Sequence, residues 1–384
     1  MFTKNIKFKN FKKQKIFSKV KKDLSNLIKE KSGIISSLKS TYKDDYNQKK
    51  ILRLKKKLEI RIIGIGGSIL GAKAIYNFLP IKKKIKFVDN LNTEIDYSKK
   101  NYLNLIISKS GNTLETIANS NVLLSKKDNN IFITGNKKSY LYKLAEDLKA
   151  EVIHHNNFIG GRYSVLSEVG MLPAELMGYN PSRFRQLNSL VKNKKFINEL
   201  LLNVSSILSH IKNKKFNSIL INYNKNLEGL LEWYKQLVSE SLGKKGKGIL
   251  PIISTMPKDN HSSMQLYLDG FDKNFFTFFF SKTNNSKKII NKKFLNRFKL
   301  LENKSISQII YSQKIATERV FVKKNIPFRS FEINKLDEKT LGELFCFFIL
   351  ETILIGKYLK LNPFDQPAVE LIKKETNRIL IQKR

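Results

Sequence analysis

The amino-acid sequence predicts an α/β protein with two doubly wound parallel sheets and helical terminal segments wrapped around them. Two observations lead to this fold class. Strand-like runs alternate with loops and helix-like runs from about residue 59, the pattern of a sheet covered by helices on both faces. The alternation stops in a helical, polar stretch and restarts at residue 218. We therefore expect four parts: a basic helical N-terminal segment at 1–58, a first α/β domain at 59–185, a second at 200–340 and a helical C-terminal segment at 341–384.

Each element has its own signal in the sequence. Apolar residues at helical spacing between 24 and 38 predict outer helices, while β-branched runs bounded by glycine and polar loops predict strands. We expect strands at 58–63, 103–107, 131–134 and 218–222, helices at about 70–78, 226–243 and 341–360, and further apolar runs at 275–280 and 307–310.

Composition limits the class of protein. The chain has 384 residues and a hydrophobic fraction of 41%, enough for two ordinary domains. Its one cysteine, Cys346, excludes an intramolecular disulfide and a cysteine-based metal site. The sequence has no apolar run of about 18 residues, and no apolar signal core follows its basic start. We expect a cytoplasmic protein with no membrane contact.

The charge balance is unusual, with 72 Lys and Arg against 32 Asp and Glu and a net charge of +40. One explanation is a polyanion partner, either nucleic acid or an acidic membrane surface. The other is drift of the whole sequence toward A/T-rich codons, which favour Lys, Asn and Ile together. Only ten of the cations are arginines, and the lysines are spread over the chain instead of clustering. This favours drift, and we expect no nucleic-acid partner.

Two loops that follow predicted strands carry groups suited to an anion. Gly64–Ser68 allows close backbone approach at a helix start, but it matches neither the dinucleotide fingerprint nor the P-loop. A tight structural turn explains this loop equally well. Ser108–Thr116 has four hydroxyls at the start of a helix, where one would be enough for a cap. The set therefore favours a cradle for a phosphate monoester.

Three further side chains are candidates for chemistry. Arg162 follows two glycines and is either part of a structural ion pair or a fixed cation beside a ligand. Gln236 and Glu240 are four residues apart and share one helical face. A helical glutamate is usually a solvated surface residue, but the nearby polar loop around His261 strengthens the alternative of a general base.

These blocks, of which the arginine block spans Gly160–Ser164 and the helical block Gln236–Lys244, occur together with the segment 362–367 in the order found in glucose-6-phosphate isomerases. The sequence resembles that family over roughly 58–376. The resemblance implies sugar-isomerase-type domains, with the C-terminal segment completing the active site. It implies reversible aldose–ketose isomerisation of D-glucose 6-phosphate and D-fructose 6-phosphate through a cis-enediol(ate), in glycolysis and gluconeogenesis. Such chemistry needs no metal and no redox cofactor. The resemblance further implies a homodimer in which His261 is shared across the interface.

The resemblance also implies a role for each matching residue. Glu240 matches the base that moves a proton between C2 and C1, and Arg162 matches the arginine beside the intermediate. His261 matches the histidine that assists ring opening, and Lys373 matches the lysine that acts on the ring oxygen. The residues that match substrate or phosphate contacts are Gly67, Ser68, Ser108, Lys109, Ser110, Thr113, Gln236 and Gln366.

Alternatives stay open at the level of sequence. The C-terminal block has Ala368 and Ile372 where the family usually has glycines, which concerns the turn that aims Lys373. Use of mannose 6-phosphate would make the protein a bifunctional isomerase, and assaying both sugars separates the two activities. A phosphosugar-binding regulator would need the phosphate cradle but not the catalytic set, and we find no separate helix-turn-helix module.

Overall fold

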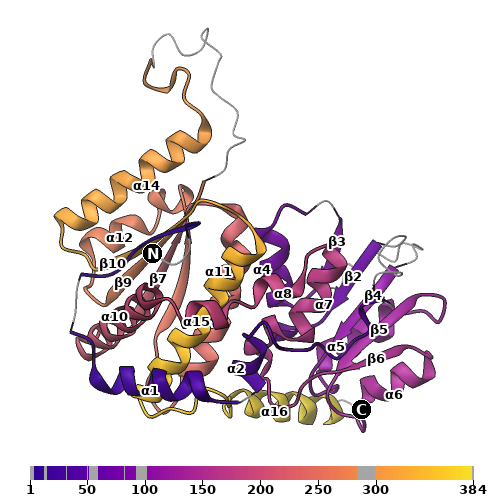
Figure 1. The fold of residues 1–384 in the computed structure, drawn as a ribbon. Helices are drawn as coiled ribbons and strands as arrows, with labels where there is room; N and C mark the ends of the chain where they lie inside the picture. The colour runs from indigo at the N-terminus through magenta and orange to yellow at the C-terminus, as the bar shows by residue number, and fades with distance from the viewer. Residues whose placement is uncertain are drawn as a thin grey trace.

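Two five-stranded sheets stand side by side in this computed structural model, with helices between and around them (Figure 1). The structure describes residues 4–12, 15–31, 33–49, 51, 59–81, 83–91, 102–282 and 299–382. The predicted α/β class with doubly wound parallel sheets is confirmed, and its physical basis is the alternation of apolar strands with amphipathic helices.

The first sheet has the order β3-β2-β4-β5-β6, and all of its neighbouring strands are parallel. Its strands are β2 (Glu59–Ile63), β3 (Ile85–Val88), β4 (Tyr102–Ile107), β5 (Asn129–Thr134) and β6 (Glu151–His154). The helices that follow them are α4 (Leu70–Phe78), α5 (Leu114–Leu123), α6 (Tyr140–Asp147) and α7 (Glu168–Met177). β4 is buried along its whole length, as a central parallel strand with helices on both faces should be.

The second sheet has the order β1-β10-β9-β7-β8. Its strands are β1 (Ile6–Lys9), β7 (Asn217–Asn222), β8 (Leu250–Thr255), β9 (Asn274–Ser281) and β10 (Phe328–Ile333). The helices around it are α10 (Lys194–Lys212), α11 (Glu228–Leu242), α12 (Met264–Asp269), α14 (Ile306–Lys323) and α15 (Glu338–Tyr358). The apolar run at 307–310 lies in α14.

The N-terminal segment differs from the expectation of helices alone. It contains α1 (Ser18–Lys29) and α2 (Gly33–Ser37), but it begins with β1, which pairs antiparallel with β10. In β1, Ile6 is buried while Lys7 and Lys9 are exposed. Such alternation suits an edge strand, whose lysines also discourage pairing with another chain.

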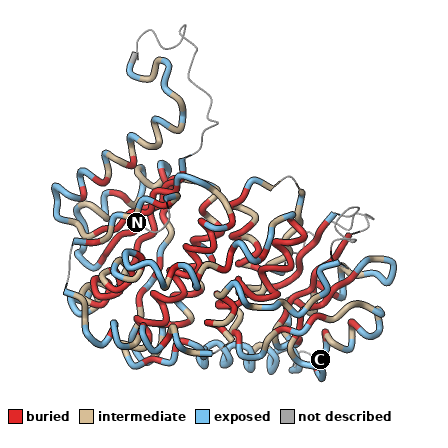
Figure 2. The backbone as a smooth tube through the Cα atoms, viewed as in Figure 1, coloured by how far each residue is buried: buried red, intermediate tan, exposed pale blue. Residues whose placement is uncertain are grey.

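A buried helical layer joins the two sheets. α11 packs against α4 of the first half and against α15, and α15 is buried almost throughout (Figure 2). The short helices α8 (Pro181–Phe184) and α9 (Leu187–Leu190) connect the halves. By contrast, α16 (Val369–Gln382) has no buried residue. Among the helices of the described ranges, none combines the length and apolar character needed to cross a bilayer.

Candidate active site

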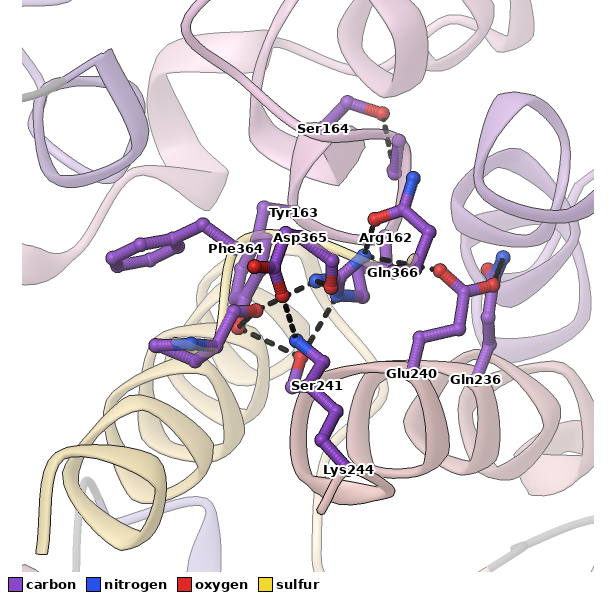
Figure 3. A network of polar contacts seen from close by, with 12 residues as sticks. Arg162, Tyr163, Ser164, Gln236, Glu240, Ser241, Lys244, Phe364, Asp365 and Gln366 are labelled. Carbon is purple, nitrogen blue, oxygen red and sulfur yellow. Dashed lines mark hydrogen bonds and ion pairs between the residues drawn. The ribbon is translucent and has the colours of Figure 1, made fainter. Parts of the chain in front are cut away.

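Glu240 lies near the C-terminal end of α11, with both carboxylate oxygens hydrogen-bonded (Figure 3). One turn earlier on the same helix, Gln236 Nε2 donates to Glu240 Oε1 at 2.7 Å. Arg162 Nη1 donates to Glu240 Oε2 at 3.1 Å. The Glu240 side chain is 29% exposed, so it is held from two sides but remains open to a ligand. The pattern of one shared helical face thus places a carboxylate and an amide together.

Arg162 joins three separate parts of the chain. It lies on the 3₁₀ segment Gly161–Leu166, and its side chain is 1% exposed. Besides Glu240, Nη1 donates to Gln366 Oε1 at 2.7 Å, and Nε donates to Ser241 Oγ at 2.8 Å. Nη2 donates to the main-chain oxygens of Pro363 at 2.6 Å and Asp365 at 3.0 Å. All five guanidinium N–H groups are therefore used, which satisfies a buried cation and gives it one orientation.

The close packing of two glycine-containing loops, at Gly67 and Gly161, positions Arg162 beside Glu240. A Cβ on Gly67 would lie 2.1 Å from the carbonyl carbon of Gly161, so any side chain at Gly67 would push the Arg162 segment away. Gly66 has a φ of +57°, a left-handed conformation that glycine adopts without strain. The tight structural turn considered for Gly64–Ser68 thus has a clear basis. Ser68 is half-buried at the end of this turn.

Tyr163, the residue after Arg162, makes further hydrogen bonds to the same parts of the chain. Its hydroxyl group lies 2.8 Å from Ser241 Oγ and donates to the Pro363 carbonyl oxygen at 3.0 Å. Burial raises the pKa of Tyr163, which therefore stays a neutral hydrogen-bonding group. The same carbonyl oxygen accepts from Arg162, so these neighbouring residues hold one point of the C-terminal turn.

The loop after β4 forms a compact set of hydroxyls at the start of α5. Ser108 Oγ lies 2.9 Å from Thr113 Oγ1 and accepts from the Gly111 amide at 3.2 Å. Ser110 Oγ accepts from the Asn112 amide at 3.2 Å. Thr113 stands at the N-cap position of α5, yet its side chain makes no capping hydrogen bond. Simple helix capping therefore does not explain the hydroxyls.

Lys109, in the same loop, is half-buried, and its ammonium donates to the Asn157 carbonyl oxygen at 2.8 Å. Burial and, to a lesser degree, the charge of Arg162 lower the pKa of Lys109 below its ordinary value. The loop thus combines neutral donors, helix-start amides and one cation, which are groups that bind a phosphate.

Two predicted catalytic residues lie outside this network. His261 ends the 3₁₀ segment Lys258–His261 and is exposed, and its side chain makes no hydrogen bond within the described ranges. Lys373 lies on α16 and pairs with Glu370 on its own helix at 2.6 Å, with both side chains more than half exposed. In a single chain, neither reaches the Arg162–Glu240 pair.

A cavity of about 500 Å³ opens beside Glu240 and lies between the end of α11 and the C-terminal turn. Its lining includes Ser239, Glu240, Lys244, Asp365 and Gln366. A cavity of this size accommodates a small polar ligand. Among the described residues, His, Cys, Asp and Glu side chains form no group of three suited to a metal.

Comparison with known proteins assigns the chain to a family. The model of the phosphoglucose isomerase family matches residues 12–249. The sequence is 32% identical to the glucose-6-phosphate isomerase of Methanocaldococcus jannaschii over 378 residues, covering 93% of each chain. The chain belongs to the phosphoglucose isomerase family.

Solved structures share the fold of this family member. A hypothetical protein from Thermus thermophilus superposes with a TM-score of 0.82 at 23% identity, covering 94% of each chain. A glucose-6-phosphate isomerase from Chlamydia trachomatis superposes with a TM-score of 0.76 at 19% identity, covering 98% of this chain and 89% of that one. At these identities the likeness is one of fold.

Some residues of the candidate site were not singled out from sequence. Ser241 and Tyr163 are neighbours of predicted residues. Ser241 accepts a hydrogen bond from Arg162, and Tyr163 donates one to the C-terminal turn. Lys244 and Asp365 lie within the blocks that carried the family resemblance, but only the structure pairs them, at 2.7 Å. Their presence in those blocks was the available signal.

Proposed function

We propose that this protein interconverts D-glucose 6-phosphate and D-fructose 6-phosphate, in glycolysis and gluconeogenesis. The observation that carries the proposal is the Glu240 carboxylate, held by Arg162 and Gln236 and opening on a cavity. The relative from Methanocaldococcus jannaschii is named for this activity and aligns over almost the whole chain.

The chemistry uses a single base. Glu240 takes the proton from C2 of the open-chain aldose while the C1 carbonyl becomes an enediolate oxygen. The hydroxyl proton on the C2 oxygen passes to the C1 oxygen, and Glu240 returns its proton to C1 as the C2 oxygen becomes a carbonyl. Negative charge that develops on the enediolate oxygens is stabilised by the guanidinium of Arg162. Because Arg162 is already oriented by protein groups, little reorganisation is needed during the step.

The phosphate is assigned to the loop after β4. Ser108, Lys109, Ser110 and Thr113 supply hydroxyls and one cation there, and the α5 amides add a favourable field. Substrate contacts are assigned to the remaining predicted positions, Gly67, Ser68, Gln236 and Gln366. Phosphate binding to the first sheet and proton transfer at α11 would place the sugar between the two halves.

We propose that the protein is a homodimer in which His261 reaches the partner's site. We assign Lys373 to the ring oxygen of the substrate and the protein to the cytoplasm. The exposure of His261 is consistent with a role outside its own chain's site. α16 also presents exposed apolar side chains, which a subunit contact would cover. They are Val369, Leu371, Ile372, Ile379, Leu380 and Ile381. We retain the four-part division of the chain, in which 341–384 completes the site.

Replacement of the base tests the proposed function. Glu240→Gln keeps the shape and the two neighbouring donors but removes the group that accepts the proton. We expect kcat to fall by about 10³-fold or more, together with loss of solvent proton exchange at C2, while the substrate analogue 6-phosphogluconate still binds. Conversion of fructose 6-phosphate to glucose 6-phosphate in a coupled assay measures kcat, and calorimetry measures binding.

The matched control is Glu232→Gln, because Glu232 lies on the same helix with an exposed side chain paired to Lys235. It should retain full activity. Substantial turnover by Glu240→Gln would refute the assignment of the base, and absence of isomerase activity in the unmodified protein would refute the function.

A further inference from the structure

Lys244 forms a hydrogen-bonded link between the helix of Glu240 and the C-terminal turn. It follows Gly243, the C-cap of α11, and its side chain is only 10% exposed. Its ammonium donates to Asp365 Oδ1 at 2.7 Å (Figure 3). It also donates to the Asn362 carbonyl oxygen at 2.5 Å. The lysine thus spans the gap between two segments that are more than a hundred residues apart in sequence.

Asp365 makes this link part of a closed set of contacts. Its other carboxylate oxygen accepts from Asn362 Nδ2 at 2.9 Å, and the Phe364 amide donates to Asn362 Oδ1 at 3.1 Å. The hydrogen bond from Lys244 lowers the pKa of Asp365, so this carboxylate stays ionised opposite the ammonium. The turn is therefore linked within itself by hydrogen bonds, and Lys244 attaches it to α11.

The C-terminal turn also determines where Gln366 lies. The residue before Gln366, Asp365, is held by Lys244 through its side chain and by Arg162 through its carbonyl oxygen at 3.0 Å. Gln366 Oε1 then accepts from Arg162 Nη1, the same nitrogen that donates to Glu240. A displacement of the turn would shift the guanidinium relative to the carboxylate, the two groups that must act together on the substrate.

We infer that Lys244 is a positioning residue of the isomerisation, which acts through the turn 362–366 to align Arg162 with Glu240. The inference rests on the proposed function, because its effect is on that reaction. Lys244 need not touch the reacting carbons, since its donors are directed to protein oxygens. Small misplacement of catalytic groups is enough to slow a reaction strongly.

Lys244→Met keeps the aliphatic stem but removes the donors. We expect kcat to fall on the order of tenfold with KM changed less than about threefold, because alignment and not substrate attraction is lost. Lys244→Arg should recover part of kcat, since it can donate to both oxygens. Asp365→Asn should lower kcat in the same way, and the double variant Lys244→Met/Asp365→Asn should be no worse than the first alone.

Lys235→Met is the matched control, because it removes one exposed positive charge from the same helix. It should match the unmodified enzyme. A kcat for Lys244→Met within twofold of the unmodified enzyme would overturn the inference. So would a rise in KM alone that disappears at high salt, which would indicate attraction of the anionic substrate.

The design separates this inference from the function itself. Unmodified protein and Lys235→Met report whether isomerisation occurs, and the ratio of Lys244→Met to them reports positioning. If Lys244→Met fails to fold, as judged by its thermal unfolding, Asp365→Asn replaces it in the same comparison: a loss of kcat supports the inference, and unchanged kcat overturns it.

Discussion

At the scale of single residues, the site depends on groups whose neighbours are distant in sequence. Glu240 and Gln236 could be paired from their spacing, but the partners of Arg162 could not be predicted. Two of them are main-chain oxygens, of Pro363 and Asp365, and a carbonyl oxygen leaves no mark on the side-chain pattern. The sequence therefore identifies which residue types are present, whereas their hydrogen bonds require the packed chain.

Lys109 gives a prediction about pH dependence at the proposed phosphate loop. Its lowered pKa means that it loses its charge at a lower pH than an ordinary lysine. A positive charge favours the phosphate dianion, so the KM for glucose 6-phosphate should rise as pH increases through the alkaline range. Lys109→Arg should keep KM level to higher pH, because a guanidinium stays protonated.

Steady-state kinetics at constant ionic strength between pH 7 and 10 measure this effect. The control is Lys138→Arg, which exchanges an exposed lysine in a neighbouring loop and should follow the unmodified profile. Identical alkaline profiles for Lys109→Arg and the unmodified enzyme would argue against a phosphate contact at Lys109.

At the scale of elements, strands made of apolar runs could be predicted, whereas a strand that mixes apolar and charged residues could not. β4, β7 and β9 contain runs of consecutive apolar residues, which is typical of buried parallel strands. β10 is equally buried but contains Arg329 and Glu332, residue types that usually indicate a solvated surface. Each is neutralised by a distant partner, Glu351 for Arg329 and Lys314 for Glu332. Such pairing is invisible in a one-dimensional pattern.

β1 gives a testable case of an element that helical spacing does not reveal. Ile6 is fully buried in the hydrophobic core that the two halves share, so Ile6→Ala should lower the free energy of unfolding by about 2–5 kcal/mol. Lys7→Ala, at the exposed neighbouring position of the same strand, should change it by less than about 0.5 kcal/mol. Urea unfolding followed by circular dichroism gives both values, and equal values for the two variants would show that β1 does not pack as described.

At the scale of the whole molecule, the single chain holds most of the proposed site but leaves His261 and Lys373 apart. The sequence could order the blocks of the site along the chain. It could not say which of them come together within one subunit, because that depends on how the two halves pack through α4 and α11. The exposed positions of His261 and α16 make subunit exchange the informative experiment.

Complementation between two inactive variants tests the shared histidine. Glu240→Gln and His261→Ala homodimers should each have low activity. After dissociation and random reassembly, about half of the dimers are hybrids with one intact site, so activity should return to about a quarter of the unmodified level. Sedimentation measures whether the reassembled protein is a dimer. No recovery in verified hybrid dimers would place His261 in the site of its own chain.

The pairing of β1 with β10 has a consequence for biosynthesis. Ile6 leaves the ribosome among the first residues, whereas its partner Ile333 emerges near the end of translation. At ordinary elongation rates the first strand must wait on the order of tens of seconds for its neighbour. The first sheet can form during this time, because all its strands precede residue 155. The C-terminal turn at 362–366, which binds Arg162, is synthesised later still. A prematurely terminated chain should therefore contain the first sheet but lack a complete active site.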